Sequence, residues 1–312
     1  MTGPSFSRPA RFRQTRVLIV GCGDVGMRVA RELLPRCRVL ALTSQPGRAQ
    51  VLRQAGLVPL LGNLDQPATL ARLAGLATRV VHLAPPPGQG SEDARTRHLL
   101  QALSRRGRVR SLVYGSTTGV YGNAGGAHFN ETRTVAPATP RAQRRVHAEA
   151  LVRWWGRRAG VRASILRIPG IYAPDRAGGT PRARLQRGTP VLRAEDDVYT
   201  NHIHADDLAR ICVVALWRGS TQRVFHASDD TEMKMGDYVD FAADLYGMPR
   251  PPRITRVEAQ AQLPPSLLSF MGESRRLDNT RLRRELRVRL HHATVEAGLR
   301  EDEAAQRPGA RR

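Results

Sequence analysis

Short apolar runs alternate along the chain with longer segments in which apolar residues recur at helical spacing. The apolar runs predict strands at residues 17–20, 39–42, 58–61, 80–83, 111–114, 163–167 and 224–227. Helical spacing predicts helices over residues 27–34, 70–73, 98–103 and 146–155 and, after a further strand, within 201–217, where Asp206 or Asp207 is placed to cap the helix. This alternation is typical of a parallel sheet covered by helices on both faces. We therefore predict an α/β protein with a doubly wound parallel sheet, the Rossmann architecture.

A glycine-rich turn follows the first predicted strand and opens the first helix. Residues 21–26 read Gly-Cys-Gly-Asp-Val-Gly. In this setting Gly21 permits a tight turn, Gly23 lets the backbone approach a diphosphate, and Gly26 lets the helix pack closely on the strand. Backbone amides at the helix N-terminus donate to phosphate oxygens. The turn predicts a nicotinamide dinucleotide site made by Gly21, Gly23, Asp24, Val25 and Gly26.

The repeating pattern breaks after Pro169, and this break indicates the domain organisation. Residues 174–190 are rich in Gly, Pro and Arg and predict a loop or part of a small lobe. The predicted division is a basic, disordered tail at 1–15, a dinucleotide-binding domain at 16–172 to which 200–230 return, a small C-terminal substrate lobe at 173–199 and 231–300, and a disordered tail at 301–312.

The end of the second predicted strand bears on the choice between NAD and NADP. An acidic residue there would accept hydrogen bonds from the adenine ribose and would repel a 2′-phosphate. The segment contains none, and Ser44 and Arg48 offer a hydroxyl and a guanidinium instead. This favours NADP over NAD as the cofactor, with a solvated Arg48 as the open alternative.

Several further motifs occur in the order of a known family. Residues 115–122 read Gly-Ser-Thr-Thr-Gly-Val-Tyr-Gly, residues 81–84 read Val-His-Leu-Ala, and residues 166–172 read Leu-Arg-Ile-Pro-Gly-Ile-Tyr. Together with Asn-His-Ile-His-Ala-Asp-Asp-Leu-Ala at 201–209, they resemble the extended short-chain dehydrogenase/reductase family, which includes the NAD-dependent epimerases and dehydratases. The resemblance covers most of residues 16–300.

The resemblance implies further site residues. Thr117 stands where the family has a hydroxyl that orients the substrate, and it comes at the carboxyl end of a parallel strand, where ligands of such sheets bind. Asn63 replaces the family's usual Asp, and its amide can still hydrogen-bond adenine. The remaining implied cofactor contacts are Leu64, Leu83, Ala84, Pro85 and Pro169.

The family's proton-transfer pair is absent. The family places a catalytic Tyr and, four residues later, a Lys shortly before an Ala-Glu pair, which here is residues 148–149. Counting back puts Arg141 and Arg145 at those positions. A guanidinium stays protonated and cannot act as the base. Arg145 can still hold the ribose or the phosphates, and Arg141 can bind an anion or stabilise an oxyanion; exposure on the surface is the alternative for each. Proton transfer would then fall to an unranked set: His128, Glu131, His147, Tyr172 and His204.

Composition adds limits to this picture. The formal net charge is +23, and Lys234 is the only lysine. Arginines are spread over the whole chain, which argues for a compositional bias and against a nucleic-acid partner. No apolar stretch predicts a membrane span or a secretory signal, so we expect a cytoplasmic protein. The three cysteines suit reduced packing residues, and no spacing of Cys and His predicts a metal.

Two functions from different classes remain open. The first is an NAD(P)-binding oxidoreductase or epimerase that acts on a sugar-like or small carbonyl or hydroxyl substrate. The second is a non-catalytic NAD(P)-binding sensor or scaffold, which the missing Tyr/Lys pair favours. A third hypothesis, nucleic-acid binding, rests on charge alone. The resemblance also implies a homodimer formed through the helices that follow the fourth and fifth strands.

Overall fold

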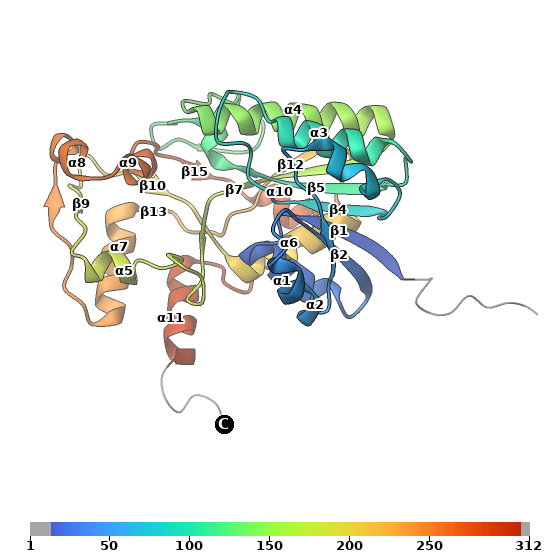
Figure 1. Cartoon of the computed structure of the whole chain (residues 1–312). Helices are drawn as coiled ribbons and strands as arrows, with labels where there is room; N and C mark the ends of the chain where they lie inside the picture. The colour runs from blue at the N-terminus through green and yellow to red at the C-terminus, as the bar shows by residue number, and fades with distance from the viewer. Residues whose placement is uncertain (1–13, 307–312) are drawn as a thin grey trace, which may run out of the picture.

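The computed structural model describes residues 14–306, and its centre is a seven-stranded parallel sheet (Figure 1). The strand order is β12-β7-β5-β4-β1-β2-β3. The bounds are β1 Thr15–Val20, β2 Cys37–Thr43, β3 Val58–Leu61, β4 Arg79–His82, β5 Ser111–Thr117, β7 Arg162–Ile168 and β12 Arg223–His226. Each of the seven contains or largely overlaps a strand predicted from an apolar run. The α/β fold class and the doubly wound parallel sheet are therefore confirmed.

Burial on both faces explains why these runs form strands. In β1, the four side chains from Val17 to Val20 are at most 1% exposed, although they alternate between the two faces of the sheet. β1 pairs with β2 on one side and β4 on the other, so the centre of the sheet carries no polar face. Each buried apolar side chain of this size contributes about 1.5–3 kcal/mol.

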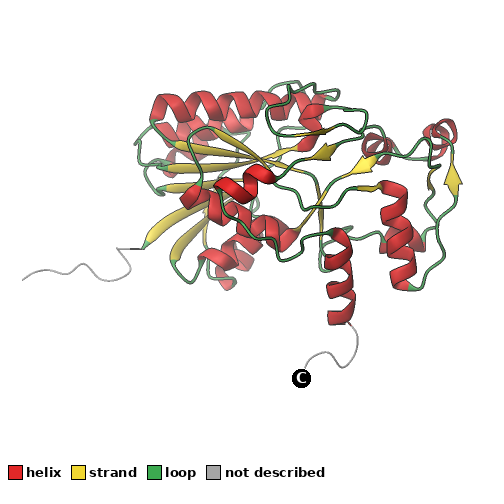
Figure 2. Ribbon diagram, turned by 180° about the vertical axis from the view of Figure 1, so that it is seen from behind, coloured by secondary structure: helices red, strands yellow, loops and turns green. Residues whose placement is uncertain are grey.

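Helices cover both faces of the sheet (Figure 2). One layer holds α1 (Asp24–Leu33), α2 (Arg48–Gln54) and α6 (Ala205–Arg218). The other holds the 3₁₀ segment η2 (Pro67–Leu73), α3 (Ala94–Ser104) and α4 (Pro140–Ala159). Within the described residues, no helix is long and apolar enough to cross a membrane.

A second, smaller lobe lies beyond the carboxyl ends of the strands (Figure 1). Paired strands connect it to the sheet domain and within itself: β8 (Gly170–Tyr172) with β11 (His202–His204), β9 (Val191–Leu192) with β14 (Arg253–Ile254), β10 (Tyr199–Thr200) with β13 (Met233–Lys234), and β6 (His128–Phe129) with β15 (Arg276–Leu277). Its helices are α5 (Arg182–Gln186), α7 (Met235–Tyr246), α8 (Arg256–Gln262), α9 (Pro265–Met271) and α11 (Val295–Gln306), while α10 (Thr280–Glu285) packs near β12. The 3₁₀ segment η3 (Thr118–Tyr121) follows β5.

A buried ion pair fastens α4 to the sheet. Arg167 of β7 donates from Nε and Nη2 to the two carboxylate oxygens of Glu149, at 3.0 and 2.8 Å. Glu149 is fully buried and also accepts from Ser116 of β5 at 2.7 Å. A third guanidinium nitrogen of Arg167 donates to the hydroxyl of Tyr121, which is hydrogen-bonded in turn to His226 of β12. Tyr121 therefore belongs to the packed interior.

Two predictions of local structure were wrong. The side chain of His204 caps α6 by accepting from the Asp206 amide, because the carboxylates of Asp206 and Asp207 bind other partners. The C-terminal tail was predicted to be disordered from residue 301, but α11 continues to Gln306. Residues 1–13 and 307–312 of the predicted tails lie outside the described part of the chain.

Candidate functional site

The glycine turn after β1 lies against the chain that leaves β4. Gly21 has a φ of +91°, and a Cβ there would lie 2.3 Å from the backbone nitrogen of Ala84. Only glycine allows this conformation and this approach. A Cβ on Gly26 would lie 2.7 Å from the Gly21 carbonyl oxygen, so α1 starts directly against the turn. The structure thus brings Gly21, Gly26 and Ala84 together as predicted.

Gly23 leaves an open space at the N-terminus of α1. It is the N-cap residue, no side chain caps the helix from this position, and no atom of the described chain lies within 4 Å of an ideal Cβ. The first amides of α1 therefore face space that no protein atom fills at this point. A dinucleotide diphosphate fits these features. Its oxygens would accept hydrogen bonds from those amides, and it can come close to the backbone because Gly23 has no side chain.

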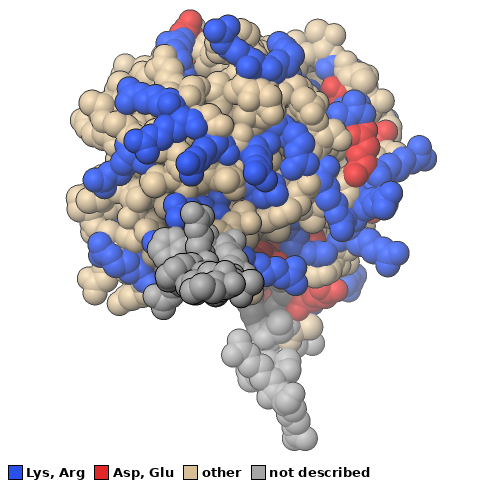
Figure 3. All heavy atoms as spheres, turned by 90° about the vertical axis from the view of Figure 1, so that its right-hand side faces the viewer, with Lys and Arg blue, Asp and Glu red and all other residues tan. Residues whose placement is uncertain are grey.

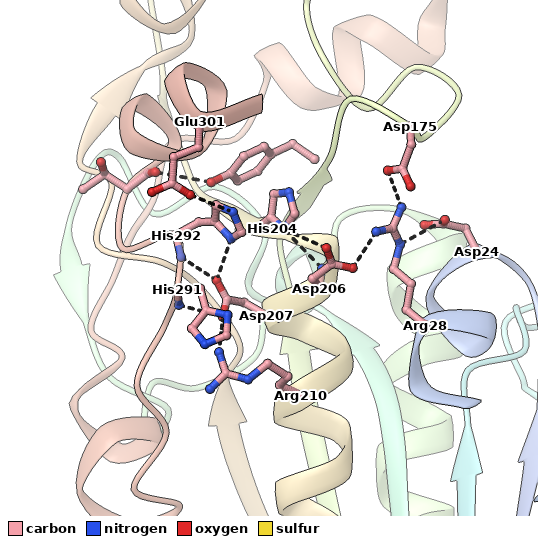
Figure 4. Close-up of polar contacts among 12 residues, drawn as sticks. Asp24, Arg28, Asp175, His204, Asp206, Asp207, Arg210, His291, His292 and Glu301 are labelled. Carbon is pink, nitrogen blue, oxygen red and sulfur yellow. Dashed lines mark hydrogen bonds and ion pairs between the residues drawn. The ribbon is translucent and has the colours of Figure 1, made fainter. Parts of the chain in front are cut away.

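Asp24 and Val25 lie in the first turn of α1. Asp24 belongs to a cluster of ion pairs that the sequence patterns do not predict. Buried Arg28 binds the carboxylates of Asp24, Asp175 and Asp206 at 3.2, 2.5 and 2.5 Å (Figure 4). Val25 packs against the core of the sheet. Arg28 thereby ties the cofactor helix to the chain that enters the lobe and to the chain that returns from it.

The residues predicted at the adenosine end lie on the loops after β2 and β3. Ser44 is exposed. Arg48 starts α2 and donates from Nη2 to the Cys22 carbonyl oxygen at 2.9 Å, so it crosses to the glycine turn. Asn63 holds its own loop, since its side-chain oxygen accepts from the Asp65 amide.

Cys22 and Leu64, next to these residues, are buried packing residues. Desolvation raises the pKa of the Cys22 thiol to about 11, although the nearby charge of Arg48 opposes the shift. A neutral buried thiol suits packing and not nucleophilic chemistry. Leu64 is buried, and its carbonyl oxygen is hydrogen-bonded to His98 at 2.7 Å.

The ends of β4, β5 and β7 meet around Gly115. A Cβ on Gly115 would lie 2.8 Å from the Leu83 side chain and 3.3 Å from that of Ile168. Leu83 therefore lies beside the end of β7, which Pro169 follows. Pro85 is exposed, and its carbonyl oxygen accepts from Arg95 at 3.2 Å. The predicted contacts after β4 and β7 thus gather at the carboxyl edge of the sheet.

Thr117 ends β5, and both its hydroxyl and the carboxylate of Glu273 lie near Gly119. The Thr117 hydroxyl accepts from the Gly119 amide at 3.2 Å. An ideal Cβ on Gly119 would lie 3.6 Å from the Thr117 hydroxyl oxygen and 4.0 Å from Oε2 of Glu273. Arg275 holds Glu273 by an ion pair of 2.5 Å and donates to the Gly122 carbonyl oxygen. Sequence reasoning missed Glu273, because no local pattern connects it with Thr117.

The two arginines at the Tyr and Lys positions have different surroundings. Arg145 is buried and donates from Nη1 to the Tyr114 hydroxyl at 3.0 Å and to the Gly115 carbonyl oxygen at 2.8 Å. It therefore joins α4 to β5. Arg141 is exposed on the first turn of α4.

Two of the unranked proton-transfer candidates contact residues other than Thr117. His147 accepts from the Asp93 amide at 2.9 Å, next to the start of α3. Half-exposed His128 lies 3.5 Å from the carboxylate of Glu232. Both contacts are with other segments of the chain, and none of them includes Thr117.

The other candidates are buried. Glu131 accepts from the His226 amide at 2.9 Å, and burial raises the pKa of its carboxyl group. Tyr172 donates to the Thr294 carbonyl oxygen at 3.3 Å. Glu131 joins the loop after β6 to β12, and Tyr172 joins β8 to the residue before α11.

His204 belongs to a cluster that closes the lobe onto α6 (Figure 4). Its ring stacks on that of His292, with 3.7 Å between the centroids. Fully buried Asp207 accepts from the amides of His291 and His292 at 2.9 and 2.8 Å. Desolvation opposes ionisation of Asp207, but a hydrogen bond with the His292 ring and those from the two amides outweigh it and lower the pKa of the carboxyl group. The cluster holds the start of α11 beside the sheet domain.

Comparisons with known proteins identify the family of this chain. The profile of the NAD dependent epimerase/dehydratase family matches residues 17–227. A dTDP-glucose 4,6-dehydratase of Mycolicibacterium smegmatis is 29% identical over 181 residues, which cover 51% of this chain and about half, 54%, of that relative.

Solved structures extend the similarity over nearly the whole chain. A conserved protein of unknown function from Silicibacter pomeroyi is 26% identical, with a TM-score of 0.77 over 94% of this chain and 99% of that one. A UDP-glucuronic acid 4-epimerase from Bacillus cereus, in complex with NAD, is 18% identical, with a TM-score of 0.72 over 93% and 97% of the two chains. With the glycine turn, the sheet order and the family match in agreement, this chain belongs to the NAD-dependent epimerase/dehydratase family.

Proposed function

We propose that this protein is an NAD(P)-dependent oxidoreductase or epimerase acting on a hydroxyl or carbonyl carbon of a small, sugar-like substrate. The observation that carries the proposal is that Thr117 and Glu273 both lie beside Gly119, at the sheet edge that also carries the glycine turn. The relatives described above are named for sugar nucleotides, which supports a substrate of that class.

In this proposal the chain's own residues bind, orient and deprotonate the substrate. When bound, the dinucleotide supplies the hydride acceptor or donor. The Thr117 hydroxyl orients the substrate hydroxyl by a hydrogen bond. The Glu273 carboxylate takes the proton from that hydroxyl as the C–H bond gives up its hydride, which leaves a carbonyl group. Arg275 keeps Glu273 in place, and the reverse reaction returns the proton to the carbonyl oxygen.

Glu273→Gln is expected to lower kcat by about 100-fold or more and to leave dinucleotide affinity unchanged, because the amide keeps the shape but cannot accept the proton. The measurement is the change of nicotinamide absorbance with a panel of nucleotide sugars. Gly119→Ala provides a second test, since its methyl group fits at ordinary contact distances yet lies between Thr117 and Glu273. The matched control is Glu232→Gln, half-exposed in the lobe. Full activity of Glu273→Gln would refute the assignment.

We further propose NADP as the preferred cofactor, with Arg48 as the residue that selects it. Arg48 is the first residue of α2, directly after the loop that follows β2, and one of its nitrogens binds the Cys22 carbonyl oxygen. Arg48→Ala is expected to weaken NADP binding by about tenfold and NAD binding by less than about twofold, the loss of one charge-assisted contact. Calorimetric titration of both cofactors measures this difference. Equal losses would show that Arg48 supports the turn and does not read a 2′-phosphate.

A non-catalytic NAD(P)-binding protein is the second candidate function. The observation that favours it is the position of Arg145, whose guanidinium is engaged with Tyr114 and Gly115 inside the protein. Dinucleotide binding without turnover across the substrate panel would support this candidate, above all if Arg141→Tyr with Arg145→Lys introduced activity. Homodimerisation through α3 and α4, which the resemblance implies, stays a prediction.

A further inference from the structure

Arginines gather at the edge of the sheet opposite the glycine turn. This amino edge consists of the six connections from a helix into a strand of the sheet, with the first residues of those strands and the last turns of the helices before them. Viewed from that side, basic side chains spread over the face and acidic ones are few (Figure 3). Nine arginines of this edge are Arg36, Arg38, Arg105, Arg106, Arg108, Arg110, Arg157, Arg158 and Arg162; others include Arg79 and Arg223, the first residues of β4 and β12.

The fold explains why residues so far apart in sequence share one face. In a parallel sheet with helical crossovers, every helix-to-strand connection returns to the same edge. Arginine also suits the last turn of a helix, where it faces the negative end of the macrodipole. None of the six connections, at residues 34–36, 55–57, 74–78, 105–110, 160–161 and 219–222, contains Asp or Glu. Arginines that are dispersed along the sequence therefore lie close together on one face of the folded protein.

The nine arginines named above lack the acidic partners that several arginines elsewhere in the protein have. Within residues 14–306, none of these nine forms an ion pair with a described acidic side chain, and all but Arg162 are exposed. In contrast, Arg28, Arg167 and Arg253, nearer the carboxyl edge and the lobe, each bind one or more carboxylates. At the amino edge Arg223 pairs with Glu285, but the positive charge of the nine arginines named above is not compensated by ion pairs with described acidic residues.

The shape and chemistry of the amino edge fit a phosphodiester backbone. From β7 to β2 the edge spans four strand spacings, about 19 Å. A duplex presents about 11 phosphates over that length. A bilayer would require exposed apolar side chains, but those six connections have none that is large, and the rings of nearby Trp154 and Trp217 lie under the guanidinium groups of Arg158 and Arg79, at 5.7 and 4.6 Å.

We propose that the amino edge binds the backbone of double-stranded nucleic acid without reading its sequence. The arginines neutralise phosphates and release counterions, which makes the affinity steeply dependent on salt. Because the glycine turn lies at the opposite edge of the sheet, nucleic acid and dinucleotide occupy separate surfaces. Binding of nucleic acid at the amino edge therefore does not depend on the proposed enzymatic activity.

The test is fluorescence polarisation of a labelled duplex of about 20 base pairs, titrated with the full chain between about 50 and 200 mM salt. The test variant is Arg105→Glu/Arg106→Glu/Arg108→Glu, in the connection between α3 and β5. The control variant is Arg187→Glu/Arg193→Glu/Arg300→Glu, which makes the same charge change at exposed positions of the lobe. NAD titration and the thermal midpoint show that each variant is folded.

We expect the test variant to bind at least about tenfold more weakly and to lower the slope of log K against log salt by about three. The control variant should stay within about twofold of the unmodified protein, and a duplex of scrambled sequence should bind equally well. Equal losses in both variants would refute the proposal, because binding would then follow net charge alone. Absence of binding at the lowest salt concentration, or preference for vesicles of anionic phospholipid over the duplex, would also overturn it.

Discussion

Gly23→Ala is expected to weaken dinucleotide binding by about 100-fold or more, with an unchanged thermal midpoint. The backbone φ of −81° suits alanine, and no atom of the described chain lies within 4 Å of the added methyl group, so the fold has no reason to lose stability. The methyl group would instead enter the space that the turn leaves for a diphosphate. Calorimetric titration with NAD and NADP measures the loss, which corresponds to about 2.7 kcal/mol.

Gly21→Ala serves as the contrasting variant. Its positive φ and the 2.3 Å approach to Ala84 mean that an added methyl group would strain the turn and overlap backbone atoms. We expect a loss of about 3 kcal/mol or more in the free energy of unfolding, whether or not a cofactor is present. If Gly23→Ala bound NAD and NADP as tightly as the unmodified protein, the diphosphate would not lie at this turn.

The second large effect is expected from Glu149→Ala. This substitution leaves the buried guanidinium of Arg167 without its carboxylate partner, which should lower the free energy of unfolding by about 3–5 kcal/mol. Urea denaturation followed by tryptophan fluorescence measures the change. Ser116→Ala removes only one neutral donor to the same carboxylate and should cost about 1 kcal/mol.

A double variant tests the cause of this loss. Glu149→Leu with Arg167→Met replaces both charges by apolar groups, so it should be less destabilised than Glu149→Ala alone. A loss below about 1 kcal/mol in Glu149→Ala, or a double variant less stable than the single one, would contradict the assignment of the ion pair as the main link between α4 and β7.

The periodic parts of this protein were predictable from sequence, because each depends on neighbouring residues. The apolar run at residues 17–20 and the glycine turn after it determine their own backbone geometry. The cap of α6 was not predictable in this way, since Asp206 and Asp207 bind Arg28 and the amides of residues 291 and 292, which only the tertiary fold brings near.

The candidate site shows the same limit. Position counting identified Arg145, but not that its guanidinium reaches Tyr114 and Gly115. Glu273 carries no local motif and comes near Gly119, two residues after Thr117, only because the lobe folds back over η3. The arginines of the amino edge likewise form a surface only after the crossovers bring distant connections together.

The Arg28 cluster bears on how this protein can change over evolutionary time. Asp175 lies where the chain leaves the sheet for the lobe, and Asp206 lies where it returns, and both carboxylates bind the same guanidinium. The intervening segment is therefore anchored at both ends to the cofactor helix. Insertions or deletions within residues 177–190, which precede β9, would reshape the lobe while the anchored ends keep their places. The length and sequence of this segment can thus vary and alter which substrates the lobe accepts, while the nucleotide-binding part of the protein stays the same.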